Sequence, residues 1–227
     1  MAEARKVQRR PKEEREADIL QAARSVFSER GYDDASITEI ARRAGVVEGT
    51  IYKYFQNKRD LLFRLMIKVL EALNSGAKAG VHKTDGVRGQ LRFLIWWHLQ
   101  AFVDDPGLCR LFIREVRSND RANQTVLYEA YRRYTSIMVR TLEGGVESGD
   151  LRRDLPLPMI RDMVYGTIEH IAWAWVAGQG TLNIDKIADD LSDMVMGGIA
   201  IPGHSERTVD GTVRRLERFM ERIEAKA

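Results

Sequence analysis

The sequence predicts an all-α protein with a small N-terminal helical bundle and a larger C-terminal one. Apolar residues recur every three or four positions along most of the 227-residue chain, which places them on one face of a helix. Strict alternation of apolar and polar residues, which would indicate strands, is absent. Short polar segments such as DDPG, ESGD and GQG separate the long helical stretches.

The first two helices have clear start and stop signals. The first is expected from about residue 14 to residue 30, with Gly31 ending it. The second starts at the segment SITE, because the Ser36 side chain can cap it and Glu39 stands three residues later, the capping-box pattern.

The remaining helices follow from the same signals. Gly45 ends the second helix, and a short third helix is expected at roughly residues 47–55. Asn57 then caps a longer fourth helix. Further helical stretches are predicted at residues 86–104, 106–118, 122–148, 157–178 and 184–200, with another amphipathic stretch within 205–227.

We expect two domains, residues 1–60 and residues 61–227, with their boundary inside the fourth helix. The composition, 44% apolar and 30% charged, is that of a globular protein that can bury a core. The net charge is only +3, so charge alone does not indicate a nucleic-acid partner, and any basic surface must be a local cluster.

Several observations predict a soluble cytoplasmic protein. The single cysteine, Cys109, cannot form an intrachain disulfide, which suits a reducing compartment. The charged N-terminus lacks the apolar segment of a signal peptide. The longest apolar run, HIAWAWVAG, is too short to span a bilayer, so no membrane partner is expected.

The third helix has an unusual outer surface. Ile51 and Phe55 lie four residues apart and are expected to face inward with Val46. The residues expected to face away are Gly49, Thr50, Lys53 and Tyr54, with Tyr52 on the flank. Two short helices joined by a glycine-bearing turn form a helix-turn-helix outline. Hydroxyl and amine groups on the second of these helices suit the phosphates and base edges of a DNA groove.

The stretch ITEIARRAGVVEGTIYKYFQNKRDLL resembles the helix-turn-helix of the TetR family of transcriptional regulators. The preceding ILQAARSVFSERGYDDASI resembles that family's first helix. The resemblance implies an all-helical homodimer that binds a double-stranded DNA operator and releases it when a small-molecule effector binds the C-terminal domain. Carried over position by position, it places the DNA contacts at Ser36, Thr38, Glu48, Gly49, Thr50, Tyr52, Lys53, Tyr54 and Lys58.

The sequence departs from the family pattern at two neighbouring positions. Members usually carry a hydroxyl residue where Val47 stands, and often a lysine where Glu48 stands. Val47 cannot cap the third helix, which costs about 1 kcal/mol locally. Glu48 suits a helix N-terminus but repels phosphate, and it could instead accept a hydrogen bond from a cytosine amino group.

Large aromatic residues in the C-terminal helices are candidates for the walls of an effector cavity, although core packing alone explains any single one. REVRSND and GTIYKYFQNKRDLL resemble the fatty-acyl-CoA-responsive branch of the family, and a flat aromatic or cationic effector is equally open. The residues predicted to bind the effector are Trp97, Phe112, Tyr131, Tyr165, Trp173 and Arg114.

Two late helices carry apolar stripes that we expect to form the homodimer interface, as the family resemblance implies. Part of each stripe must also pack inside its own subunit. The predicted interface residues are Ile160, Val164, Thr167, Ile168, Ile171, Leu191, Met194 and Val195.

Two segments and two other functions stay open. The basic tail that contains Arg5, Lys6, Arg9, Arg10 and Lys12 is either solvated or an arm along DNA, and the 205–227 stretch is a surface helix or part of an interface. A helical adaptor that binds only protein is one alternative function. An enzyme is another, but the sequence contains no HExxH, P-loop, GxSxG or dinucleotide motif, so no enzyme, metal or cofactor is predicted.

Overall fold

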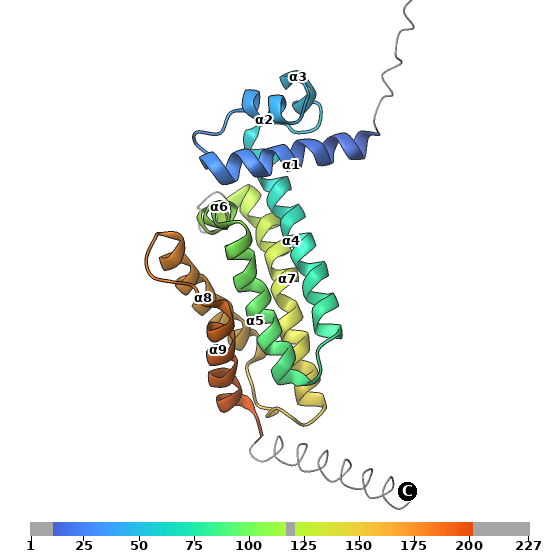
Figure 1. Ribbon diagram of the computed structural model, residues 1–227. Helices are drawn as coiled ribbons and strands as arrows, with labels where there is room; N and C mark the ends of the chain where they lie inside the picture. Colours follow the sequence, from blue (N-terminus) through green and yellow to red (C-terminus); the bar gives the residue numbers. More distant parts are fainter. Residues whose placement is uncertain (1–10, 117–120, 202–227) are drawn as a thin grey trace, which may run out of the picture. The chain divides into compact units, whose positions relative to one another are not determined.

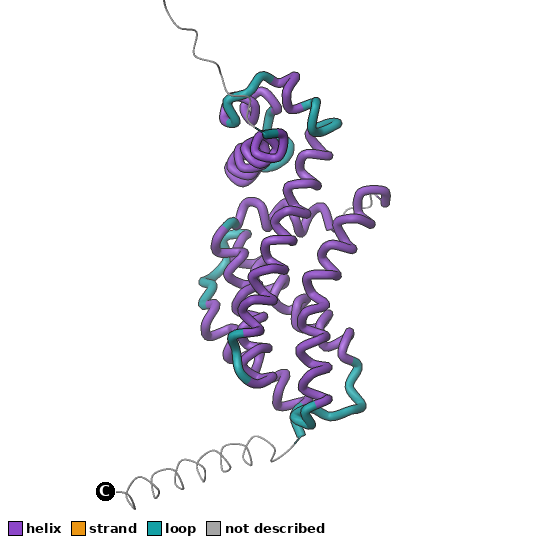
Figure 2. The backbone as a smooth tube through the Cα atoms, turned by 90° about the vertical axis from the view of Figure 1, so that its right-hand side faces the viewer, coloured by secondary structure: helices purple, strands orange, loops and turns teal. Residues whose placement is uncertain are grey.

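The computed structural model describes residues 11–116 and 121–201. These residues contain helices and loops but no strand, apart from one isolated antiparallel bridge between Leu151 and Ala200 (Figures 1 and 2). The predicted all-α class is confirmed. The helices are α1 (Lys12–Arg30), α2 (Ile37–Arg43), α3 (Glu48–Ile51), α4 (Lys58–His82), α5 (Gly86–Asp104), α6 (Pro106–Val116), α7 (Arg121–Glu147), α8 (Leu157–Val176) and α9 (Ile184–Ile199).

The predicted helix starts rest on the expected hydrogen bonds. The Ser36 hydroxyl accepts from the backbone N–H of Glu39 at 3.1 Å, and Asn57 Oδ1 accepts from the N–H of Asp60 at 2.9 Å. Gly31 follows α1 with a φ of 77°, in the region that favours glycine. Local capping chemistry therefore sets where α2 and α4 begin.

The third helix is shorter than predicted. Its α-helical part covers Glu48–Ile51, and residues 52–54 form a turn. The N–H groups of Lys53 and Tyr54 donate to carbonyls three residues back, which is the tighter 3₁₀ pattern. Val47 precedes the helix and supplies no side-chain cap, as expected. An uncapped start leaves the first turn of α3 without the support that Ser36 gives α2.

Two compact units divide the described residues, and α4, α5 and α7 each contribute to both. Unit 1 contains residues 11–75, 100–116, 121–134 and 176–179. Unit 2 contains residues 76–99, 135–175 and 180–201. The predicted boundary near residue 60 stays a prediction, since α4 runs through it without a break. The tail before residue 11 and the 205–227 stretch lie outside the described residues.

The helix-turn-helix lies in unit 1. There α1 packs against α2 and α6, while α2 packs against α3 (Figure 1). Apolar residues from each of these helices are almost completely removed from solvent. This burial stabilises the packing of the helices in unit 1. The fully buried set includes Ile19, Ala23, Val26, Phe27, Ile40, Ile51, Phe55 and Leu61.

Unit 2 joins parts of α4, α5 and α7 to α8 and α9. Its buried apolar residues include Leu91, Leu94, Ile95, Met138, Val164, Ile168 and Ala188. Three ion pairs tie α5 to α9 at the surface: Arg92 with Asp189 at 2.5 Å, Arg92 with Asp185 at 3.6 Å, and Arg88 with Asp193. In the described part of the chain, no helix has the length and apolar character needed to cross a membrane.

Candidate nucleic-acid interface

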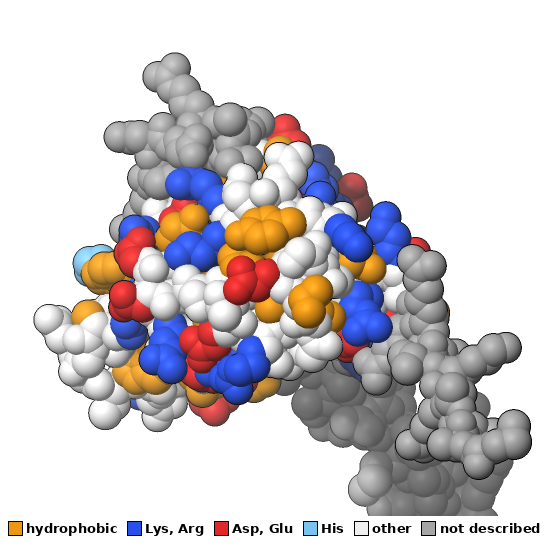
Figure 3. All heavy atoms as spheres, turned by 90° about the horizontal axis from the view of Figure 1, so that it is seen from above, with side chains coloured by type: hydrophobic (Ala, Val, Ile, Leu, Met, Phe, Trp, Pro, Cys, Tyr) orange, Lys and Arg blue, Asp and Glu red, His pale blue; other side chains and the backbone are white. Residues whose placement is uncertain are grey.

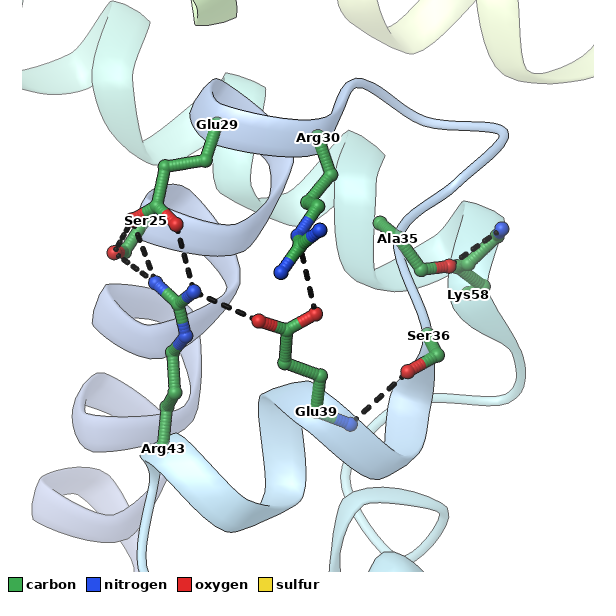
Figure 4. A network of polar contacts seen from close by, with 8 residues as sticks. All are labelled: Ser25, Glu29, Arg30, Ala35, Ser36, Glu39, Arg43 and Lys58. Carbon is green, nitrogen blue, oxygen red and sulfur yellow. Dashed lines mark hydrogen bonds and ion pairs between the residues drawn. The ribbon is translucent and has the colours of Figure 1, made fainter.

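A polar network clamps α2 onto α1. The Arg43 guanidinium donates to both carboxylate oxygens of Glu29 at 2.6 Å, to Glu39 at 2.7 Å and to the Ser25 hydroxyl at 2.8 Å (Figure 4). The hydrogen bonds from Arg43 and then from Ser25 lower the pKa of Glu29 to about 2. The hydrogen bonds that Arg43 donates to Glu29 and then to Glu39 raise the pKa of Arg43. Charge-assisted bonds in this geometry fix the orientation of α2.

Lys58, at the first position of α4, closes the loop between α1 and α2. Its ammonium donates to the carbonyl oxygens of Tyr32 at 2.8 Å, Asp33 at 3.2 Å and Ala35 at 2.9 Å. An ammonium has three N–H donors, so these carbonyls use all of them. The predicted phosphate contact of Lys58 stays a prediction, and the structure adds a positioning role that sequence reasoning missed.

The outer side of α3 is accessible, as predicted. Ile51 and Phe55 are each 1% exposed and hold the segment to the core. The predicted contacts Ser36, Thr38, Glu48, Gly49, Tyr52 and Lys53 are exposed, whereas Thr50 and Tyr54 are half-buried. Every predicted contact on α2 and α3 therefore keeps accessible surface.

Charge is unevenly distributed over this end of the protein. Figure 3 shows apolar side chains in the middle of the face and Lys and Arg toward its margins, with Asp and Glu side chains in both places. Basic margins suit the phosphate backbones on both sides of a groove, because phosphate contacts position a protein on DNA without reading sequence. The middle of such a face meets base edges instead.

The predicted effector residues of unit 1 have well-defined neighbours. The rings of Phe112 and Tyr131 lie 5.7 Å apart between centroids. Arg114 is exposed and pairs with Asp33 at 3.0 Å, which ties α6 to the loop after α1. Its neighbour Glu115 is buried and pairs with Arg59 at 3.2 Å. Phe112 and Tyr131 are thus brought together, and Arg114 holds a structural ion pair.

The three predicted effector residues of unit 2 have different surroundings. Trp97 stacks on Phe93 at 6.0 Å and lies over Gly76, while Trp173 is 45% exposed. Tyr165 is buried against His98, with ring centroids 4.8 Å apart. Burial lowers the pKa of His98 to about 3, so its imidazole is neutral at physiological pH.

An open pocket of about 840 Å³ lies in unit 2, and none of the six predicted effector residues lines it. It lies between the end of α4, the start of α5 and the end of α7. Lys78 and Arg140 supply two cations to its lining, and Asp85 and Asp150 two carboxylates. Its volume suits a small-molecule ligand. The sequence does not predict this pocket, because its lining is polar and lacks the large aromatic residues from which the effector cavity was predicted.

The predicted interface residues divide by burial. Ile160, Val164, Ile168, Leu191 and Val195 are buried within their own subunit, whereas Thr167 and Ile171 are half-buried and Met194 is 69% exposed. The exposed apolar side chains of α8 are instead Met159, Met163 and Trp173. Because these three positions are separated by 4 and 10 residues, they share one side of the helix.

Comparison with known proteins covers both regions. The family model for the N-terminal domain of bacterial regulatory proteins of the tetR family matches residues 19–65. The model for the tetracyclin repressor-like C-terminal domain matches residues 84–199.

Two curated relatives align over nearly their whole lengths. The fatty acid metabolism regulator protein of Bacillus subtilis is 27% identical over 85% of this chain and 97% of its own. The transcriptional repressor KstR2 of Rhodococcus jostii is 24% identical over 83% and 92%. A crystal structure of FadR from Bacillus subtilis in complex with stearoyl-CoA superposes with a TM-score of 0.73, at 26% identity over 81% of this chain and 98% of that one.

Proposed function

This chain belongs to the TetR family of bacterial regulatory proteins and is a ligand-responsive DNA-binding transcriptional regulator, and we propose that it is a repressor released from its operator by a fatty acyl-CoA. The proposal rests on the similarity to FadR, which this chain matches over 98% of the length of that protein. FadR was solved in complex with stearoyl-CoA. KstR2, the second relative, is itself named a repressor.

The two alternative functions draw no support from these comparisons. The family consists of transcriptional regulators rather than enzymes. Burial raises the pKa of the Cys109 thiol to about 12, so this residue does not present a thiolate nucleophile at neutral pH. The exposed polar surface of α3 serves a DNA groove better than a protein-binding adaptor, because hydroxyl and amine groups match phosphate oxygens.

The DNA contacts that we propose are eight of the nine predicted residues, and we propose that the ninth, Lys58, acts on DNA binding through the loop that it closes. Their support is the accessibility of the α2 and α3 side chains and the anchoring of both helices by buried apolar residues. A dimer would place two copies of α3 in successive major grooves about 34 Å apart. An effector that binds the released conformation more tightly would then lower the affinity for DNA.

For the dimer face, burial favours the accessible side of α8 together with the exposed part of α9. Met159, Met163 and Trp173 form an apolar strip on α8, and Met194 stands exposed on α9. Exposed apolar surface of this kind marks an interaction site. The half-buried Thr167 and Ile171 remain members of the proposed interface.

For the effector, the pocket of unit 2 offers groups that match the polar part of a CoA thioester. Lys78 forms no ion pair among the described residues. Within the same part of the chain, Arg140 donates only to the Ser136 hydroxyl. These cations suit phosphate groups. Asp85 and Asp150 can accept from amide and amino N–H groups of the same ligand, and Val81, Val87 and Ile137 add apolar surface.

The test is an anisotropy titration of full-length protein on a duplex selected from a random pool, with stearoyl-CoA, CoA or stearate added. We expect release with stearoyl-CoA at concentrations where CoA and stearate have little effect. The Lys78→Ala/Arg140→Ala double variant should bind DNA normally and need at least tenfold more stearoyl-CoA. Lys68→Ala is the matched control, since Lys68 lies on α4 outside the pocket and pairs with Glu71.

Two results would count against this scheme at different points. If no duplex is enriched from the pool, DNA binding itself fails. If a duplex binds but stearoyl-CoA leaves it bound, the acyl-CoA assignment fails while the DNA-binding function stands.

A further inference from the structure

Val47 is the most exposed large hydrophobic side chain of the described residues that carry the helix-turn-helix. It immediately precedes α3, and the residue is 73% exposed. The residue makes no side-chain cap, so the position sacrifices about 1 kcal/mol of local stability that a serine or threonine would supply. Val47 therefore lowers the stability of its helix and leaves apolar surface in water. A partner molecule that covers this side chain would account for both features.

Glu48 follows as the first residue of α3, and its side chain is also exposed. It forms no ion pair with any residue that the structure describes. A carboxylate here repels phosphate groups, so it is unsuited to the DNA backbone. It is suited to the amino group of cytosine, which is a hydrogen-bond donor at the major-groove edge of a G·C pair.

The position of both residues at the start of α3 suits contacts with base edges. The N-terminal residues of a recognition helix are the ones that reach base edges. Apolar side chains gather in the middle of this face, Lys and Arg lie toward its margins, and Asp and Glu are found in both places (Figure 3). Gly49, the next residue, has no described atom within 4 Å of the point where a Cβ would stand, which leaves room for the approach of a base pair.

We propose that Val47 and Glu48 are specificity-determining residues that read neighbouring base pairs in each half-site. The Val47 isopropyl group contacts the 5-methyl group of a thymine, and the Glu48 carboxylate accepts a hydrogen bond from the N4 amino group of a cytosine. This inference rests on the proposed DNA-binding function and adds to it the base chemistry that the operator must offer.

The test for Val47 removes single methyl groups from the DNA. Full-length protein first selects an operator from random duplexes, and each thymine of a half-site is then replaced by deoxyuridine, which lacks only the 5-methyl group. At one position we expect the wild-type protein to bind about fourfold more weakly, the contribution of one buried methyl group. Val47→Ser restores a helix cap and should bind the thymine and deoxyuridine duplexes equally.

The test for Glu48 repeats the selection with Glu48→Gln. Glutamine keeps an acceptor oxygen but adds an N–H₂ donor, which allows bidentate pairing with adenine, so adenine should replace one cytosine of the half-site in an increased share of the enriched duplexes. Asp34→Asn is the control, because it removes one exposed negative charge elsewhere in unit 1 and should leave the selected sequence unchanged.

The outcomes separate this inference from the function on which it rests. A failure to enrich any duplex overturns both. An operator that binds normally but shows no methyl dependence, or shows the same dependence in Val47→Ser, overturns the role of Val47 alone. An unchanged selected sequence for Glu48→Gln does the same for Glu48.

Discussion

The ammonium of Lys58 lies 2.8 Å from the carbonyl oxygen of Tyr32 and 4.5 Å from the centre of its ring. The contact joins the start of α4 to the loop after α1, 26 residues earlier in the chain. Replacing Lys58 with methionine should therefore destabilise the protein by about 2 kcal/mol, the usual worth of hydrogen bonds to a charged group. Urea unfolding measures this loss.

Lys53→Met is the matched comparison, because Lys53 is exposed on the turn after α3 and has no such acceptors. It should unfold like the wild type, while the slope of log affinity against log salt falls by about 1. Lys58→Met should leave that slope nearly unchanged. If Lys58→Met lowers the slope and keeps full stability, its role is the phosphate contact that the sequence predicts.

Local features of the fold were predictable, and long-range polar contacts were not. The caps at Ser36 and Asn57 and the stop at Gly31 depend on residues within four positions, so the sequence displays them directly. The pairing of Arg114 with Asp33 spans 81 positions. No local pattern states which distant side chain an exposed arginine will meet, so the sequence does not predict this pair, and the effector contact of Arg114 stays a prediction.

The apolar stripes of α8 and α9 illustrate a second limit. Periodicity identifies an apolar face, but it does not say whether that face meets the subunit's own core or a second subunit. Val164 and Ile168 are fully buried in their own subunit, while Met163, the residue directly before Val164, is 54% exposed. Whether a residue of α8 faces its own core or the accessible surface depends on the packing of the whole chain.

The start of α6 is held tightly against α1. Asp105 caps α6 through the N–H of Leu108 and also accepts hydrogen bonds from Arg24 and Ser28 of α1. A Cβ atom on Gly107 would lie 2.2 Å from the backbone oxygen of Ser28. Gly107→Ala must therefore push α6 away from α1, and we expect a loss of about 1–3 kcal/mol in urea unfolding.

Gly144→Ala provides the contrast, since Gly144 lies inside α7 with no atom near the position of a Cβ. It should stabilise the protein by about 0.5–1 kcal/mol, because alanine loses less conformational freedom in a helix. Equal stability of the two alanine variants would contradict the close contact between α6 and Ser28.

The dimer face is testable at Met163, whose side chain lies on the exposed apolar strip of α8. Met163→Glu would bury an unpaired carboxylate in the interface, at a cost of about 3 kcal/mol or a roughly 100-fold weaker dimer. Analytical ultracentrifugation measures the change. Val126→Glu introduces the same charge at an apolar residue of α7 that is 53% exposed, and it should leave the dimer intact. Dissociation by Val126→Glu instead would place the interface on α7.

The buried imidazole of His98 makes stability depend on pH below neutrality. Its pKa falls from 6.5 to about 3 on folding because burial disfavours the charged form. Between these values the unfolded chain binds a proton that the folded chain does not, so stability rises with pH and is lost as the pH falls below 6.5. Each pH unit contributes about 1.4 kcal/mol, so about 2 kcal/mol is lost between pH 6.5 and pH 5.

Urea unfolding of the wild type and His98→Gln at pH 7.5 and pH 5 isolates this contribution, because carboxylates titrate alike in both proteins. The variant should lose about 2 kcal/mol less than the wild type over that interval. His170→Gln, at an exposed position of α8, should follow the wild type. Equal pH dependence of His98→Gln and wild type would mean that the imidazole takes up a proton in the folded state, which a side chain so fully buried against Tyr165 resists.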